Sequence, residues 1–404
     1  MRAGEIADWF AIGVAVSLPW STSATSVFIA LWLVAVFPTL GIASLRREVM
    51  TAAGGLPVLL WALAVIGMLW ADVSWDERLH ALRGFHKLLL IPLLLLHFRR
   101  SQRVSWVILG FCVSASVLLV LSWSVSSWTG GLWGREKADF GVPVKDYIAQ
   151  SSIFALCALG LLGYSVQLWR EKRVQLMLII VGLAAAFIAN LVYVATSRTT
   201  LVVLAVLLLL LAFRHTGWRG TLSVGLLGGV TAGLLMVSSP YLHGRLSRSV
   251  AEVKDYRAGK PITSGGLRLE YWKKSVEFVA AAPVIGHGTG TIESLFRRSA
   301  ISGTNAMLIT GNPHNQILSV AVQLGLMGTL VLVAMWIAHL ALFRECTLIS
   351  WLGFVVVVQN IMSSFFNSHL FDFVQGWTYV FGVSMLGGVC LVKKPNLTSH
   401  RRCR

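Results

Sequence analysis

His314 is the residue of this chain with the clearest potential for chemistry, because it stands where a long polar loop meets a continuous apolar run. Asn312 is a good helix N-cap and Pro313 a good first helical residue, so we expect His314 in the first turn of the helix that follows. The helix dipole disfavours a protonated imidazole there, and nearby arginines would disfavour it further. A neutral imidazole is what general-base catalysis requires.

The alternative for His314 is a structural role, in which the ring only caps the helix or bonds a carbonyl group. Two glycines bear on this choice. Gly325 and Gly328 follow 11 and 14 residues later, on the same predicted helix face. Gly325 would lie about 16 Å deeper. Small residues on that face would let another helix pack closely beneath the histidine.

Two arginines are candidates for binding an anionic substrate. Arg198 lies in a hydroxyl-rich stretch, residues 196–200, between two apolar runs. These hydroxyls favour a preorganised anion site, although a lone arginine at a membrane boundary can also reach lipid headgroups. Arg268 shares a predicted helix face with Trp272 and Ser275, at spacings of four and seven residues. On its own, such a charge is more typical of a solvated helix.

A charged stripe is predicted on the fourth apolar helix. Its members are spaced by four, three and four residues: Asp76, His80, Arg83 and Lys87. Lys87 would lie about 15 Å from the cytoplasmic end of that helix, where a cation is costly and by default marks a site with a partner. The alternative is a structural ion pair of Lys87 with Asp72 or Asp372. Lys145, at the outer start of the sixth predicted helix, is a further candidate.

The composition indicates which elements must position these residues. Of the 404 residues, 56% are hydrophobic and 13% are charged, against about 25% charged residues in a soluble domain. Apolar runs near the length of about 20 residues that crosses a bilayer recur throughout. Barrel strands would alternate apolar and polar residues, so we expect an all-α polytopic membrane protein. About twelve transmembrane helices are predicted: 7–19, 22–40, 57–71, 78–97, 104–125, 147–168, 174–195, 200–213, 220–238, 315–342, 347–366 and 370–391.

The distribution of basic residues predicts the orientation of these helices. The net charge of +17 does not indicate nucleic acid, because the basic residues gather at loops. With the N-terminus inside, the cytoplasmic segments hold 17 of the 34 Lys and Arg residues, and the short outer loops hold few. Both termini are therefore expected in the cytoplasm. His314, Arg198 and Arg268 are expected on the outer, periplasmic face.

A long outer loop, residues 239–313, interrupts the rhythm of short connections. Within it, Leu267–Ala281 is predicted as an amphipathic helix with Trp272, Val276 and Val279 on one side. The chain is accordingly divided into nine transmembrane helices (1–238), a helical periplasmic loop domain (239–313), three further helices (314–391) and a basic cytoplasmic tail (392–404).

Neither a metal nor a cofactor is expected. The outer loops carry no paired acidic residues of the kind that hold a divalent metal in many sugar transferases. Gly286-x-Gly288-x-Gly290 lacks the strand–turn–helix context of a dinucleotide site.

These features together resemble the O-antigen ligase family of bacterial lipopolysaccharide assembly. The family signature is a His-Asn pair, nine residues and a Gly-x-x-Gly pair. Here it reads His314-Asn315, then residues 316–324, then Gly325-Leu-Met-Gly328. Arg198 lies where the family keeps an essential arginine. The run from Arg268 through Trp272 to Pro283 and Gly286-x-Gly288 is similar to the family's loop pattern.

The resemblance implies a metal-independent, inverting glycosyltransferase of the membrane-embedded GT-C type. Such an enzyme, in the bacterial inner membrane, moves O-polysaccharide from undecaprenyl diphosphate to a sugar hydroxyl of lipid A–core. His314 would be the base, and Arg198 and Arg268 would bind the donor diphosphate. Its partners would be these two glycolipids and the membrane lipids.

Three alternatives are left open. An O-antigen polymerase would use the same donor with a lipid-linked glycan as acceptor. A protein O-oligosaccharyltransferase usually has a longer C-terminal region than the thirteen residues expected after the last helix here. A lipid-glycan transporter could also have twelve helices, but the common two-halves type places its long loop in the cytoplasm between helices six and seven.

Overall fold

The computed structural model describes residues 3–127, 141–195, 197–238, 264–301, 308–345 and 347–392. Residues 239–263 and 302–307 of the predicted outer loop, and 393–404 of the predicted tail, lie outside the described residues. The described ranges contain helices, turns and no strand. The prediction of an all-α fold is thereby confirmed for them.

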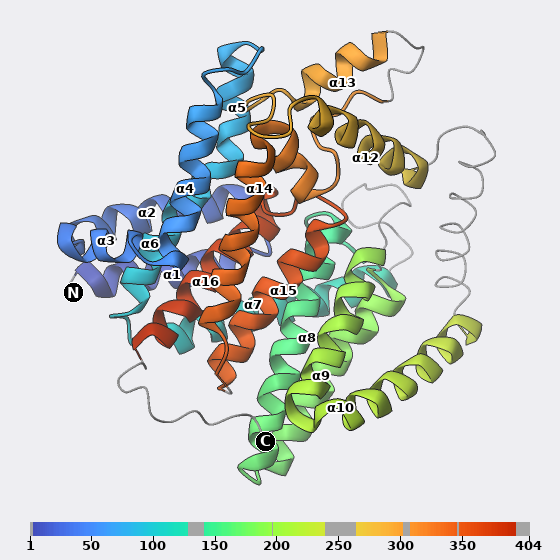
Figure 1. Cartoon of the computed structure of the whole chain (residues 1–404). Coiled ribbons are helices and arrows are strands. Elements are labelled where there is room, and N and C mark those ends of the chain that lie inside the picture. Colours follow the sequence, from blue (N-terminus) through green and yellow to red (C-terminus); the bar gives the residue numbers. More distant parts are fainter. Residues whose placement is uncertain are drawn as a thin grey trace.

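Figure 1 shows the helices in their order along the chain. They are α1 (Ala3–Ser17), α2 (Thr22–Val36), α3 (Ile42–Val49), α4 (Ala52–Gly67), α5 (Trp75–His86), α6 (Leu90–Phe98), α7 (Val104–Ser127), α8 (Tyr147–Arg170), α9 (Val174–Tyr193), α10 (Arg198–Ser238), α12 (Ser264–Ala281), α13 (Ile292–Ile301), α14 (Gln316–Leu342), α15 (Leu348–Ser364) and α16 (Phe373–Val392). Two short 3-10 helices, Phe37–Thr39 and Lys87–Leu89, follow α2 and α5.

In the described part of the chain, eight helices are long and apolar enough to cross a membrane, or nine if the bent pair α3 and α4 counts as one span. The prediction of about twelve is higher for two reasons. Helices α1 and α15 have only 15 and 17 residues. The predicted runs 200–213 and 220–238 are present as two helices that meet at Gly217, where φ is 67°, and because they are continuous as α10 they count as one span.

Polar N-caps decide where several helices begin. The side chains of Ser21, Thr51, Asp146 and Thr347 each accept a hydrogen bond from a backbone N–H in the first turn of α2, α4, α8 and α15. Such a bond satisfies one of the donors that a helix start leaves free. Because these bonds are local, the sequence alone carries the signal for the start of each helix.

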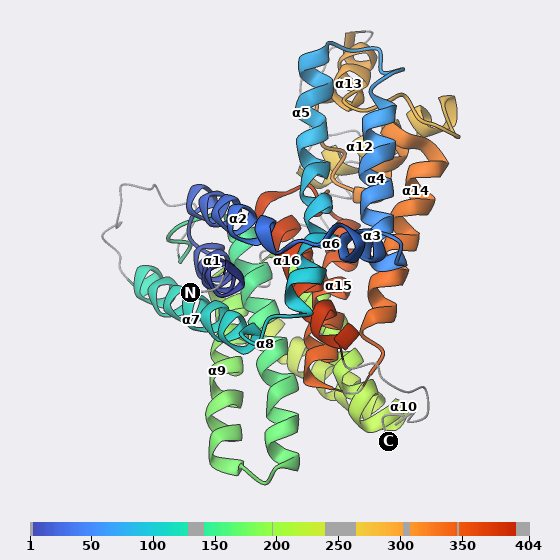
Figure 2. The ribbon, with the colours of Figure 1, turned by 90° about the vertical axis from the view of Figure 1, so that its left-hand side faces the viewer.

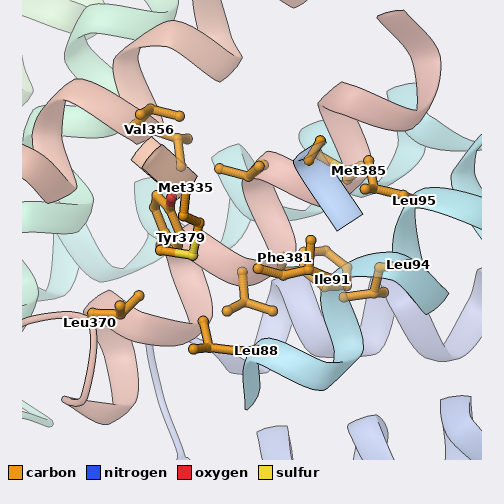
Figure 3. Packing of buried hydrophobic residues seen from close by; sticks show 14 of the residues in the cluster. Leu88, Ile91, Leu94, Leu95, Met335, Val356, Leu370, Tyr379, Phe381 and Met385 are labelled. Carbon is orange, nitrogen blue, oxygen red and sulfur yellow. The ribbon is translucent and has the colours of Figure 1, made fainter. Parts of the chain in front are cut away.

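The interior divides into two apolar clusters. The larger joins α4, α6, α14 and α16, and Figure 3 shows Met335 beside Tyr379 and Ile91 beside Phe381 within it. The second joins α8 and α9 to the first half of α10 and to α15, where Phe154 packs edge-on against Phe187 with ring centroids 5.1 Å apart. Helices in a bilayer associate mainly through such close packing and through polar contacts between helices.

Polar contacts connect the loops at each end of the bundle. His97 and Asp8 approach to 3.1 Å at one end, and Arg298 and Asp72 to 2.8 Å at the other. Each contact joins two segments that the charge pattern assigns to the same face of the membrane. Helices α4, α5 and the first part of α14 rise together to the end of the molecule that bears α12 and α13, as the two views at right angles show (Figures 1 and 2). This group of helices positions His314.

Candidate active site

His314 lies outside the helix in which it was expected. The N-cap of α14 is Asn315, whose side chain accepts hydrogen bonds from the N–H groups of Ile317 and Leu318. The expectation that His314 occupies the first helical turn is therefore wrong, because capping occurs three residues later than Asn312. His314 instead has a φ of 53°, in the left-handed region.

Asn312 nevertheless shapes this turn. Its side-chain Oδ1 accepts the backbone N–H of His314 at 2.8 Å and the hydroxyl of Ser368 at 2.9 Å. A short side chain that bonds the backbone two residues onward stabilises a turn. The left-handed conformation of His314 is thus supported by a local bond.

The His314 ring is held by a loop far away in the sequence, residues 365–372, between α15 and α16. His314 Nδ1 and Asn367 Oδ1 are 2.9 Å apart. Asn367 Nδ2 donates to Asp372 Oδ2 at 2.9 Å, and His369 Nδ1 lies 2.9 Å from the same oxygen. A hydrogen-bonded row therefore runs from His314 through Asn367 to the carboxylate of Asp372.

Helix α12 covers the other side of His314. The ring of Tyr271 stacks on the imidazole, with centroids 5.9 Å apart and planes inclined by 24°. Trp272 Nε1 donates to the carbonyl oxygen of His314 at 3.3 Å. Arg268 lies one turn earlier on the same helix. The structure thus brings together Arg268, Trp272 and His314, three of the residues singled out from the sequence.

The apolar face predicted for α12 is partly wrong. Val276 is 57% exposed, whereas Tyr271 and Ser275 are buried. Helix α12 turns Tyr271 and Phe278 toward Phe296 of α13, at centroid distances of 5.6 and 5.2 Å. The physical reason is the position of α13, which the spacing of apolar residues within α12 cannot reveal.

The surroundings of His314 lower the pKa of its imidazole below the ordinary value of 6.5. Burial is the largest cause, and the positive charge of Arg268 acts in the same direction. The hydrogen bond to Asn367 and the charge of Asp372 oppose the shift without cancelling it. His314 is therefore neutral at neutral pH, which is the state that a base needs.

The Gly-x-x-Gly pair after His314 has a role different from the one expected. Gly325 adopts φ 62° and ψ −155° and breaks α14. The partner at the break is the loop that follows α12, and not another helix. Four backbone bonds of 2.8–3.2 Å join them: His287 N to Val322 O, Gly288 N to Gln323 O, Leu326 N to Pro283 O and Met327 N to Val284 O. The loop thus forms hydrogen bonds with backbone N–H and C=O groups of α14 that the break leaves without a partner in the helix.

Three glycines allow this loop to follow its path. Gly286, Gly288 and Gly290 have φ values of 69°, 95° and 97°, which favour glycine. Between them, Thr289 donates its N–H to Gly67 O and its hydroxyl to Ala64 O, at 3.1 and 2.6 Å. The loop therefore ties α14 to the end of α4. It also fixes the end of α12, the helix that covers His314.

Lys87 anchors the loop that holds His314. Its side chain is buried, with 7% of the residue exposed, and Nζ donates to the carbonyl oxygens of Phe371 and Asp372 at 3.0 and 2.7 Å. Both predicted ion pairs are replaced by other contacts, because the Asp372 carboxylate faces Asn367 and His369, and Asp72 pairs with Arg298. The rest of the stripe does not converge on Lys87: Asp76, His80 and Arg83 are exposed.

Arg198 is the first residue of α10. Two hydrogen bonds place the start of α10 at the end of the bundle where α15 ends. Ser151 Oγ donates to Ala195 O at 2.6 Å, and Gln359 Nε2 of α15 donates to Ser152 O at 2.8 Å. Arg198 thus begins its helix at the end of the bundle that bears the loop 365–372.

Lys145 and Asn315 have structural partners. Lys145 Nζ donates to Leu18 O at 2.7 Å and lies 5.6 Å from the ring centre of Phe373, the first residue of α16. Burial lowers the pKa of Lys145 to about 8, against the opposing charge of Asp146. Asn315 caps α14, and its Nδ2 donates to Phe365 O at 3.3 Å. Both residues therefore position elements around the site.

The sequence reasoning missed the loop 365–372 as a part of the site. Its signal was present, since Asn367, Ser368, His369 and Asp372 form a polar cluster between two apolar runs. Tyr271 was also missed, because only the packing of α12 places it on the imidazole.

Comparison with known families adds one match. A family model described as O-antigen ligase matches residues 183–333. This stretch runs from α9 into α14 and contains Arg198, Arg268, His314 and the Gly325–Gly328 pair. No curated protein gives a significant match to the chain.

Proposed function

We propose that the chain transfers a finished O-polysaccharide from undecaprenyl diphosphate to a sugar hydroxyl of lipid A–core, because residues 183–333 match a family model described as O-antigen ligase. The protein would lie in the inner membrane of a bacterium, with its active site on the periplasmic face and both chain termini in the cytoplasm. The fold would be of the GT-C type, and no metal would take part in the reaction.

In the proposed reaction His314 is the general base. Its Nε2 takes the proton of the acceptor hydroxyl while that oxygen attacks the anomeric carbon of the donor. The bond from this carbon to the diphosphate oxygen breaks, and its electron pair leaves with the diphosphate. A single displacement inverts the anomeric centre. The energy comes from the glycosyl diphosphate bond.

Arg198 and Arg268 would bind the diphosphate and stabilise the charge that grows on it. A guanidinium offers a planar pair of N–H donors that matches two phosphate oxygens. Donors already in place where charge develops lower the barrier without reorganisation. The nearness of Arg268 to His314 supports this role, because the leaving group and the base must lie on opposite sides of one reacting carbon.

The observation that carries the proposal is the half-buried imidazole of His314, whose pKa is lowered and which Asn367 holds at 2.9 Å beside the Arg268-bearing helix. A histidine that served only as a helix cap would bond the first turn of α14. Here Asn315 caps α14, which frees the His314 ring for other chemistry.

Reconstitution tests the function directly. The full chain, purified with lipid-linked O-antigen and lipid A–core, is expected to produce glycosylated lipid A–core at the same rate with and without excess EDTA. Growth of the glycan on the lipid carrier, with lipid A–core untouched, would instead identify a polymerase. Transfer to neither acceptor would overturn the proposal, and activity restored only by added metal would overturn the metal-free reaction.

Arg198→Lys tests the grip on the diphosphate. Lysine keeps the charge and loses the planar pair of donors, so transfer is expected to fall by about tenfold or more, equivalent to about 1.4 kcal/mol. Arg219→Lys, an exposed arginine on the other half of α10, serves as the control and should leave transfer unchanged. Equal activity of the Arg198 and Arg219 variants would show that Arg198 does not bind the diphosphate bidentately.

A further inference from the structure

The orientation of the Asn367 amide follows from its two neighbours. Asp372 offers only acceptor atoms when ionised, so the Asn367 atom 2.9 Å from its carboxylate must be the NH2 nitrogen. The amide oxygen of Asn367 consequently points to His314 Nδ1. This conclusion comes from the chemistry of the partners, which decides amide orientation where hydrogens are not seen.

Asn312 leads independently to the same orientation. Its Oδ1 accepts the backbone N–H of His314, which can only donate, so its NH2 group faces Asn367 at 2.9 Å. The Asn367 atom that receives this NH2 group must be the oxygen. The hydrogen bonds of Asp372 and those of Asn312 therefore indicate independently that Asn367 Oδ1 faces the imidazole.

An oxygen without a proton leaves one choice for the histidine. His314 Nδ1 must carry the hydrogen of the neutral ring, and Nε2 must carry the lone pair. Among the residues that the structure describes, none bonds Nε2. We propose that Asn367 is a positioning residue that fixes His314 in the Nδ1–H tautomer and so makes Nε2 the basic atom. This inference rests on the proposed function for its catalytic meaning.

Asn367 is itself firmly held. Lys87 binds the carbonyls of Phe371 and Asp372. Gln316, in the first turn of α14, accepts the N–H of Leu370 through Oε1 at 3.0 Å. Two membrane helices thus fix the loop from both sides. The hydrogen bond between His314 and Asn367 needs this support. If the Asn367 side chain could rotate, its NH2 group, a donor, could face His314 Nδ1 in place of the oxygen acceptor.

The tautomer can be measured without an activity assay. In full-length protein labelled with ¹⁵N-histidine, the His314 signals are identified by their loss in His314→Asn. Above the pKa of His314, the wild type is expected to show a protonated Nδ1 and an unprotonated Nε2. Asn367→Ala is expected to shift the ring toward the Nε2–H form, and Asn367→Asp, which keeps an oxygen acceptor, to preserve Nδ1–H. Asn360→Ala, on helix α15 before the loop that bears Asn367, serves as the control.

Kinetics supply the second measurement. Asn367→Ala is expected to lower kcat by about 10²-fold, the lower end of what a positioned base contributes, with little change in the KM for the lipid donor. An Nε2–H wild-type ring, or an unchanged tautomer in Asn367→Ala, would overturn the inference even if His314 is essential. If Asn367→Ala does not fold, the wild-type spectrum alone decides. An active His314→Asn variant would contradict the proposed function and leave the tautomer result standing.

Discussion

Replacing His314 by asparagine is expected to lower kcat for glycan transfer by about 10²–10⁴-fold, because the amide cannot accept the proton of the acceptor hydroxyl. Asparagine is chosen because it tolerates the left-handed φ of 53° at this position better than most residues. The variant should therefore insert and fold. Normal transfer by a folded His314→Asn protein would exclude His314 as the base. His80→Asn, an exposed histidine of α5, is the control.

The pH dependence of glycan transfer by the wild type should also report the protonation state of His314. Burial and the charge of Arg268 lower the pKa of His314 below 6.5, so the imidazole is neutral and active at neutral pH. Transfer is expected to hold steady through pH 7 and to decline only as the pH falls through the lowered pKa, where the base becomes protonated. An increase in the rate on acidification would contradict the role of a neutral base.

Gly325→Ala is expected to have the largest effect on folding. At φ 62° and ψ −155°, a side chain costs about 1–3 kcal/mol of backbone strain. The added Cβ would also overlap the backbone of Val284 and Gly286, which cannot move aside as a flexible side chain could. The four hydrogen bonds between α14 and the loop would be broken or stretched, and α12 would lose its position over His314.

Thermal unfolding in detergent and the yield of inserted protein measure this effect. Gly182→Ala is the matched control, since Gly182 lies on α9 with no atom within 4 Å of an added Cβ. Alanine there should leave the unfolding temperature unchanged or raise it, because it is the better helix former. If both alanine variants unfold at the wild-type temperature and transfer glycan normally, the break at Gly325 has no structural importance.

The parts of the fold that the sequence predicted well depend on local physics. Apolar runs place helices in a bilayer wherever they are long enough. Caps such as Asp146 and Thr347 act on the first turn of their own helix. The chemical candidates also came from local signals, since a histidine between a polar loop and an apolar run is unusual wherever it lies.

What could not be predicted depends on contacts between distant segments. The helix cap was placed three residues too early, at Asn312 in place of Asn315, because both are plausible caps and only the folded turn decides between them. The break at Gly325 needs the loop from Pro283 to Gly288, whose backbone groups receive the bonds that the helix gives up.

The sequence by itself predicted a helical protein with several membrane-spanning helices, and it carries a stretch, residues 183–333, that matches a family model described as O-antigen ligase. Only the tertiary structure decided how His314 is held. Asn367 and Asp372 lie 53 and 58 residues beyond His314, and Lys87 lies far before it. Their pairing follows from the packing of α15 and α16 beside α14, because hydrogen-bond partners in a folded site are selected by proximity in space.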